Sequence, residues 1–207
     1  IKASGLKALV GGNIGLPALD LLECADESAV VALELSSFQL ETTYSLKPVA
    51  ATILNVSEDH LDRYVDYKAY VEAKRRIFNN ADIIVENSED ELTHAECSQV
   101  ETEELKAKVK SFGLTVDCDW QVDVEQGVLL GNKQQVLQLN ELTLQGVHNA
   151  LNVAAAFALI EAAGIVMTDA VVTCAKNYKG MAHRSQLVTI KNGVTYINDS
   201  KATNVGA

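Results

Sequence analysis

The chain has 207 residues, is 48% hydrophobic and 22% charged, and carries a formal net charge of −11. This length is enough for one well-buried core and a smaller second unit, and the composition is that of a soluble globular protein. The acidic balance argues against a nucleic-acid-binding surface, which needs clustered Lys and Arg, but leaves room for small anionic ligands held by a few local donors.

Short apolar runs in the first half of the chain are typical of buried parallel strands. They are rich in β-branched residues and nearly continuous rather than alternating, and they cover residues 6–10, 29–35, 49–56 and 82–87. Helical patterns separate them, at residues 16–23, 37–46 and 66–80. This alternation predicts an α/β fold in which a mostly parallel sheet is flanked by helices on both faces.

The second half of the chain has a different texture. Residues 117–146 alternate with period two and carry turn signals at Gly127 and residues 131–133, which predicts a small antiparallel hairpin array. An Ala-rich helix should begin near His148, and another should follow Thr168. The Asn-Gly pair at 192–193 signals a further hairpin, and we expect a domain boundary near residue 185.

The chain shows no signal peptide and no membrane span. Its longest apolar run, "ALNVAAAFALIEAAGIVM", is interrupted by Asn152, Glu161 and Gly164, so we expect a buried helix. The four cysteines are scattered without CxxC spacing, which favours free thiols in a reducing compartment. The chain opens without Met and closes on "ATNVGA", so we expect a piece of a longer protein.

Polar residues at the ends of the predicted strands are the first candidates for a site, because open parallel sheets bind ligands beyond the carboxyl ends of their strands. Glu34 ends the second strand, and His60 follows the third in "LNVSEDHLDRY". Each has an ordinary alternative, since local amides or an arginine could satisfy Glu34 and His60 could be structural. Together, at the ends of neighbouring strands, they favour a divalent-cation site.

Lys74 falls inside the apolar stripe of the helix predicted over residues 66–80. A lysine buried near a metal site would have its ammonium form disfavoured, and the neutral amine can add carbon dioxide to become a carbamate, an anionic oxygen ligand. The alternative is a lysine whose stem covers apolar surface while its head reaches water past Phe78. Periodicity alone favours that alternative.

Two further motifs could bind a nucleotide. "GGNIG" at residues 11–15 is either a phosphate cradle or a tight strand-to-helix turn, and no GxxxxGK[ST] occurs in the chain. Asn149 and Asn152 share a face in the first turns of a helix and could read the edge of an adenine. Their alternative is helix capping by Asn149 and an interhelical bond by Asn152.

The last candidates lie around the expected domain boundary. Arg184 in "HRS" could reach a phosphate in a cleft between domains. Asp199, Lys201 and Thr203 alternate after a predicted strand and so project to one side, which suits a ribose and an acidic substrate. A solvated loop is the alternative for this segment.

The combination of motifs resembles the Mur ligase family. The matching stretches run in the family's order: "GGNIGLPAL", "ELSSFQLE", "ATILNVSEDHLDRY", "AKRRI", "GVHNALNVAAA", "HRS" and "INDSKATN". "SSFQLE" and "NDSKATN" resemble the branch that adds D-glutamate to UDP-N-acetylmuramoyl-L-alanine. The resemblance implies an ATP-dependent amide ligase of peptidoglycan synthesis, cytoplasmic and monomeric, that works through an acyl phosphate without a nucleic-acid or membrane partner.

The resemblance also implies residue roles, beginning with the metal and the UDP-substrate. Glu34 and His60 would hold Mg²⁺, and Lys74 would be the carbamylated lysine that orders a second Mg²⁺ and the γ-phosphate of ATP. These three residues form the expected catalytic set. Asn13 and Ser36 would face the UDP-substrate.

The remaining implied roles concern the nucleotide and the amino acid. Asn149 and Asn152 would hold the adenine of ATP, and Arg184 would reach its phosphates. Asp199 and Lys201 would contact the ribose side, and Thr203 would contact the incoming D-glutamate. The resemblance carries no role for residues 88–145.

Parts of the family plan are missing from this sequence. Its phosphate-binding loop should precede residue 1, as should a uridine-binding domain, and most of a third domain should follow residue 207. We therefore expect residues 1–185 to be a central ATP-binding domain and residues 186–207 the first strands of a C-terminal ligase domain, inactive alone. The alternatives are a nucleotide- or metal-binding module without turnover and a ligase that extends folates.

Overall fold

The computed structural model describes residues 1–95, 109–184 and 186–201, in which the strands form three sheets. The largest has six strands. The first four run parallel to one another, and the fourth then forms an antiparallel meander with the last two. In order across the sheet these are β3 (Ala50–Thr52), β4 (Ile83–Asn87), β5 (Val109–Gly113), β6 (Trp120–Asp123), β7 (Val128–Gly131) and β8 (Gln134–Gln138).

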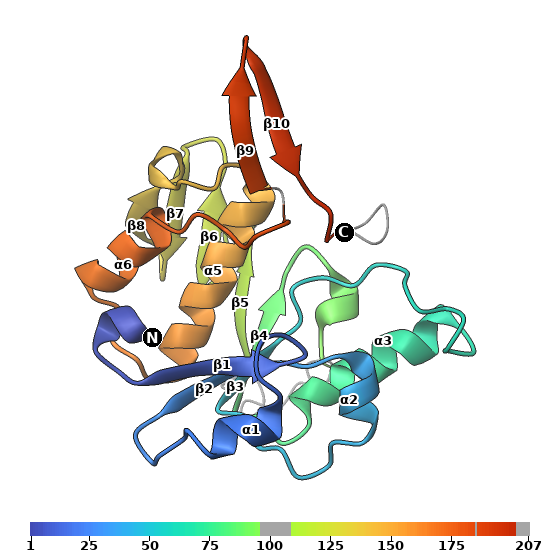
Figure 1. Ribbon diagram of the computed structural model, residues 1–207. Coiled ribbons are helices and arrows are strands. Elements are labelled where there is room, and N and C mark those ends of the chain that lie inside the picture. The colour runs from blue at the N-terminus through green and yellow to red at the C-terminus, as the bar shows by residue number, and fades with distance from the viewer. Residues whose placement is uncertain (96–108, 185, 202–207) are drawn as a thin grey trace.

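The six-stranded sheet is buried on both faces at its parallel end. Successive residues of a strand point to opposite faces, and Val85 accordingly joins one apolar cluster while Ile84 joins another. The first cluster lies under α5 (Val147–Ala162), whose small residues Ala154 and Ala158 let the helix approach the sheet closely. Figure 1 shows α5 running along this face, with α6 (Asp169–Lys176) beside it. The second cluster includes Phe78 from the opposite side.

A two-stranded parallel sheet stands apart from the main one. β1 (Ala8–Gly12) pairs with β2 (Val30–Glu34), and Gly12 lies opposite Glu34 at their carboxyl ends. The prediction that these strands share one sheet with β3 and β4 is wrong for the described residues. A βα alternation specifies strands, helices and buried faces, but it does not specify which strands become neighbours. Two short helices follow these strands, α1 (Ala18–Leu22) and α2 (Ser37–Glu41).

Helix α3 (Tyr67–Arg75) continues into a 3₁₀ turn, η2 (Arg76–Phe78), and together they cover the predicted helix. Asp66 caps its start, because its carboxylate accepts a hydrogen bond from the Ala69 N–H at 2.7 Å. Arg76 Nε donates to the Leu40 carbonyl at 2.8 Å, which satisfies the C-terminal end of α2. This bond ties η2, which continues α3, to the end of α2.

The predicted Asn-Gly hairpin forms as β9 (Gln186–Lys191) and β10 (Val194–Asn198). Asn192 and Gly193 both have positive φ, as a tight hairpin turn requires. The hairpin is exposed along nearly its whole length and projects from the rest of the molecule (Figure 1). The remaining elements are the short 3₁₀ turns η1 (Lys2–Ser4), η3 (Glu91–Thr93) and η5 (Leu139–Glu141).

The predicted fold class is therefore confirmed: an α/β structure with a mostly parallel sheet and a small antiparallel region. No helix in the described ranges is both long and apolar enough to cross a bilayer. Among the described cysteines, Cys24, Cys118 and Cys174 are free thiols.

Candidate functional site

The turn after β1 brings the first two site residues together. Gly12 has φ +107°, and a Cβ there would lie 2.3 Å from the Glu34 carbonyl oxygen, so only glycine fits. The Asn13 N–H donates to that same carbonyl at 2.6 Å, and Asn13 Nδ2 donates to Glu34 Oε1 at 3.2 Å. The "GGNIG" segment is thus a tight strand-to-helix turn that fixes Asn13 against the end of β2.

Glu34 lies at the carboxyl end of β2, as predicted, but its side chain is exposed rather than buried in the apolar run. Its exposure follows from the strand that it ends, because no residue of β2 is buried. The Asn13 amide is one of the local partners that the ordinary alternative required. An exposed carboxylate at a strand end remains available to a solvated cation.

Ser36 begins helix α2 as its N-cap. Its hydroxyl accepts from the Gln39 N–H at 3.3 Å, and the Gln39 side chain accepts from the Ser36 N–H at 2.9 Å, which completes a capping box. The sequence pattern "SSFQ" could have revealed this structural role. The cap fixes the direction in which α2 leaves the end of β2.

His60 lies in the loop after β3, with φ +54°, a left-handed conformation that histidine adopts more readily than most residues. β2 and β3 are not paired, so the prediction that Glu34 and His60 end neighbouring strands is wrong. Helix α2 nevertheless brings the two segments together. The Phe38 ring lies 5.0 Å from the His60 ring, so the chain just beyond Glu34 contacts the His60 loop directly.

Lys74 is half-buried on α3, and its ammonium nitrogen lies 4.8 Å from the centre of the Tyr70 ring. This cation–π contact is an arrangement that neither sequence alternative predicted. Tyr70 also contacts the edge of His60, at 6.1 Å between ring centres. One aromatic ring therefore touches both His60 and Lys74.

The metal-ligand chemistry of this region is sparse. In the parts of the chain that the structure describes, no three His, Cys, Asp or Glu side chains gather where they could hold an ion. Mg²⁺ in nucleotide sites is ordinarily held by one or two carboxylates, water and phosphate oxygens rather than by a protein cage. Glu34 supplies a carboxylate and His60 an imidazole of the kinds that such a partial site could use, and the nucleotide would have to complete it.

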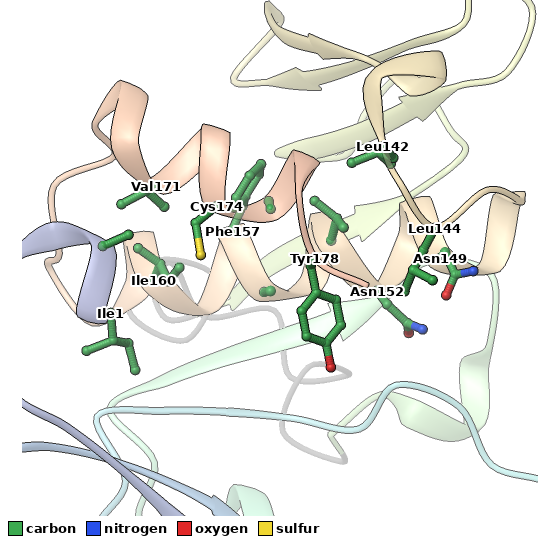
Figure 2. Close-up of a pocket in the computed structure, with 14 residues that line it drawn as sticks. Ile1, Leu142, Leu144, Asn149, Asn152, Phe157, Ile160, Val171, Cys174 and Tyr178 are labelled. Atoms are coloured by element: carbon green, nitrogen blue, oxygen red, sulfur yellow. The ribbon is translucent and has the colours of Figure 1, made fainter. Parts of the chain in front are cut away.

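Asn149 and Asn152 line an apolar cavity of about 290 Å³ between α5 and α6, with the side chains of Leu142, Phe157 and Tyr178 (Figure 2). Asn149 Nδ2 donates to the Gln145 carbonyl at 2.8 Å, so part of its capacity is used at the helix start. Two amides on the wall of a concave, mostly apolar pocket are what a planar heterocycle needs for orientation.

Arg184 and Lys201 come from segments that meet at the base of the β9–β10 hairpin. The Lys201 N–H donates to the His183 carbonyl at 3.0 Å, and the His183 ring and the Asn198 amide hydrogen-bond at 2.9 Å. Arg184, Asp199 and Lys201 are all exposed. Thr203 lies outside the described residues.

Sequence reasoning missed the aromatic side chains that hold this region together. Phe38 lies in the motif "SSFQLE" and Tyr70 in the helix predicted over residues 66–80, and neither pattern predicts a ring contact. The i, i+4 spacing of Tyr70 and Lys74 is nevertheless a signal for a contact between a ring and a cation. Tyr64 stacks on Phe38, at 6.0 Å and 4° between ring planes. Burial raises the pKa of Tyr64 and that of Tyr67, which keeps both phenols neutral.

Residues 9–160 match the family model of the Mur ligase middle domain. The chain is 48% identical over 208 aligned residues to the UDP-N-acetylmuramoylalanine–D-glutamate ligase of Haemophilus influenzae strain 86-028NP, covering 100% of this chain and 46% of that protein. The ligase of the same name from Alcanivorax borkumensis is 43% identical over 205 residues, covering 99% of this chain and 44% of that protein. The chain thus spans about half the length of the curated relatives it matches.

Solved structures show the same fold. MurF from Acinetobacter baumannii superposes with a TM-score of 0.71 at 20% identity, covering 94% of this chain and 45% of that one. MurF ligase from Thermotoga maritima, in complex with ADP, superposes with a TM-score of 0.61 at 18% identity, covering 94% of this chain and 47% of that one.

Proposed function

The chain belongs to the Mur ligase family, whose middle domain it matches, and we propose that it is the ATP-binding centre of a ligase that joins D-glutamate to UDP-N-acetylmuramoyl-L-alanine. The observation that carries this proposal is identity of 43–48% across essentially the whole chain to relatives bearing that name.

In the proposed reaction, a terminal carboxylate oxygen of UDP-N-acetylmuramoyl-L-alanine attacks the γ-phosphorus of ATP, and ADP leaves. The amine of D-glutamate then attacks the carbonyl carbon of the acyl phosphate. An amide forms, the amine loses a proton, and phosphate leaves with one of the original carboxylate oxygens. All three reactants are anionic, so the site must neutralise charge and exclude water rather than supply a protein nucleophile.

The proposed metal site consists of Glu34, His60 and a carbamylated Lys74, which would hold two Mg²⁺ ions together with the nucleotide. When bound, Mg²⁺ would neutralise charge on the transferring phosphoryl group. The contacts from Phe38 to His60 and from Tyr70 to Lys74 support this grouping, because they bring side chains from α2, the His60 loop and α3 into one cluster.

The nucleotide would be held by residues of the second half of the chain. Asn149 and Asn152 would orient the adenine, and their position on the wall of an apolar cavity supports that role. Arg184 would reach the phosphates, and Asp199 and Lys201 would lie on the ribose side. The backbone bond from Lys201 to His183 supports placing these exposed polar residues together.

Substrate recognition would fall to three residues. Asn13 and Ser36 would face the UDP-substrate, and the bonds of Asn13 to Glu34 and of Ser36 to Gln39 support a rigid placement. Thr203 would contact D-glutamate.

We further propose that residues 1–185 form the central domain and that residues 186–207 begin a C-terminal domain. The exposed β9–β10 hairpin supports this division, because an isolated two-stranded hairpin is marginal in water and its apolar residues need a partner layer. The full-length enzyme would be a cytoplasmic monomer, and the 207 residues alone would show no ligase turnover because they contain no Walker A loop.

The test is ligase activity of the full-length enzyme. We expect ADP release that requires both UDP-N-acetylmuramoyl-L-alanine and D-glutamate. ADP release with a folate and L-glutamate instead would assign the chain to a folate-extending ligase. Nucleotide binding without release under any substrate pair would leave only a binding module.

A further inference from the structure

Four rings form a continuous cluster across three segments of the candidate site. This aromatic cluster consists of Phe38 on α2, His60 and Tyr64 in the loop after β3, and Tyr70 on α3. Phe38 contacts His60 and Tyr64, Tyr70 contacts His60 and Tyr64, and the ring centres lie 5.0–6.1 Å apart. These are separations at which ring orientation carries energy beyond simple burial.

His60 depends on its neighbours for its orientation. Its side chain is 47% exposed, and it sits on a loop in a left-handed backbone conformation rather than on a helix or strand. Its Nδ1 lies 3.8 Å from an Asp59 carboxylate oxygen, too far for a hydrogen bond that would fix the ring plane. The imidazole instead contacts two rings. The angle between ring planes is 58° with Phe38 and 73° with Tyr70.

Phe38 and Tyr70 differ in what else they do. Tyr70 is only 4% exposed, whereas Phe38 is 38% exposed. An exposed phenylalanine that packs on a half-exposed histidine contributes little to folding. Its ring contacts His60 and Tyr64 and lies 5.7 Å from the Arg63 guanidinium carbon, and the contact with His60 is the one that reaches a proposed metal ligand.

We propose that Phe38 is a positioning residue that holds the His60 imidazole in the orientation needed at the metal site. This rests on the proposed function, in which His60 binds Mg²⁺. Because Phe38 lies two residues after the Ser36 cap, the same contact ties the end of β2, where Glu34 lies, to His60. The ring thereby couples the two proposed Mg²⁺ ligands, which belong to different parts of the fold: Glu34 ends β2 in the two-stranded sheet, and His60 lies in the loop after β3 of the main sheet.

The first test is a double-mutant cycle in the full-length enzyme. Phe38→Leu should lower kcat about two- to tenfold, the range expected for one aromatic contact, and Phe38→Tyr should restore it. In a His60→Ala background, Phe38→Leu should cause no further loss, because its effect passes through the imidazole. Equal losses in both backgrounds would overturn the proposal. Phe38→Met, which keeps bulk without a ring, is the second variant if Phe38→Leu does not fold.

The second test uses no activity at all. In the metal-free protein, Phe38→Leu should weaken the NMR cross-relaxation between the His60 imidazole carbon-bound protons and the Tyr70 ring protons, which reports ring orientation whether or not the Phe38 ring current is present, and Phe38→Tyr should leave it nearly unchanged. Tyr44→Leu is the matched control, since this exposed ring lies just beyond α2 but contacts Arg76 rather than His60. Unchanged cross-relaxation between His60 and Tyr70 in Phe38→Leu would reject the positioning role. Wild-type activity of His60→Ala would instead reject the metal role of His60, which is a separate failure.

Discussion

Lys74 is the residue on which the proposed chemistry depends most. The structure shows its ammonium group over the Tyr70 ring and half-buried, between the extremes of a surface lysine and a fully buried one. A carbamate would replace that cation with an anion, so forming it requires the side chain to leave the ring face. The cation–π contact between Lys74 and Tyr70 is thus the arrangement of the unmodified lysine, before carbon dioxide adds to it.

Replacing Lys74 tests its role directly. Lys74→Ala in the full-length enzyme should lower kcat about 10²- to 10³-fold, the scale seen when one preorganised electrostatic group is removed. A short-chain carboxylate such as acetate or propionate should restore part of that loss by occupying the place of the carbamate.

Lys68→Ala is the matched control, because Lys68 is an exposed lysine on the same helix. Its kcat should stay within about twofold of wild type. Full activity of Lys74→Ala without any added carboxylate would rule out the carbamate ligand.

Glu161 makes the clearest pH prediction. Partial burial acts to raise the pKa of this carboxyl, but hydrogen bonds from Trp120 and Asn132 and the charge of Lys110 outweigh it, so the net shift is downward. A group with a depressed folded-state pKa stabilises the fold above its unfolded pKa and loses that contribution as the pH falls through the folded value.

Glu161→Gln should therefore lower the unfolding free energy at pH 7 by about 1 kcal/mol. The unfolding free energy of this variant should also fall less than that of wild type as the pH is lowered from about 5 to about 3. Urea unfolding followed across this range measures both effects. Glu125→Gln, an exposed carboxyl in the β6–β7 turn, removes the same charge and should change neither. If the unfolding free energy of Glu161→Gln fell as steeply with decreasing pH as that of wild type, other carboxyl groups would be responsible for the pH dependence.

For single residues, the sequence indicated where along the predicted elements each site residue lies, but not which side chains surround it. The motifs located Glu34 at the end of a strand, His60 in the segment after another strand and Lys74 on a helix, but they did not indicate that Glu34 is exposed or that the Lys74 ammonium group lies over the Tyr70 ring. Ser36 and Asn149 each make a local backbone or capping bond that their sequence neighbours, Gln39 and Gln145, could have indicated.

At the scale of elements, α5 is the helix on which the fold is built. Ala154 and Ala158 are fully buried against the sheet, while Ala156 faces outward on the same helix. Ala158→Leu should lower the unfolding free energy by about 1–3 kcal/mol through overpacking, and Ala156→Leu should stay within about 0.5 kcal/mol of wild type. Urea denaturation gives both values. Similar values for the two variants would contradict the packing of α5 described here.

Element existence was predictable from hydrophobic periodicity, but element ends were not. The predicted strand over 49–56 forms only as Ala50–Thr52. Beyond it, the Leu54 carbonyl accepts from the Asn87 side chain and the Val56 N–H donates to the Asp90 side chain, so side chains replace the ladder bonds of a strand. The predicted helix over 37–46 ends at Glu41, where Arg76 takes the last carbonyls.

Region 88–145, in which sequence similarity suggested no role, proved architecturally central. Strand β5 was not predicted, yet it lies in the middle of the main sheet and joins the parallel strands to the predicted hairpin array. Its run "VKSFG" is short and mixes polar with apolar residues, which gives neither a strict alternation nor a continuous apolar stretch.

At the scale of the whole molecule, family and fold class were readable from sequence, and both are confirmed. The division of the strands into separate sheets could not be predicted from the sequence. The hydrophobic pattern determines which face of a strand is buried, but tertiary packing determines which strands pair with one another. The assignment of residues to ATP, Mg²⁺ and substrate stays a prediction that rests on the resemblance, supported by the three groups of contacts around His60, Asn152 and His183.

The proposed full-length enzyme would activate the UDP-substrate as an acyl phosphate, and tracing the oxygen of its terminal carboxylate is the sharpest test of that step. With the terminal carboxylate of UDP-N-acetylmuramoyl-L-alanine labelled with ¹⁸O, the full-length enzyme should release phosphate that carries one labelled oxygen for each amide formed. Phosphate without label, formed while amide accumulates, would contradict the account, because the carboxylate oxygen would then never have bonded to phosphorus.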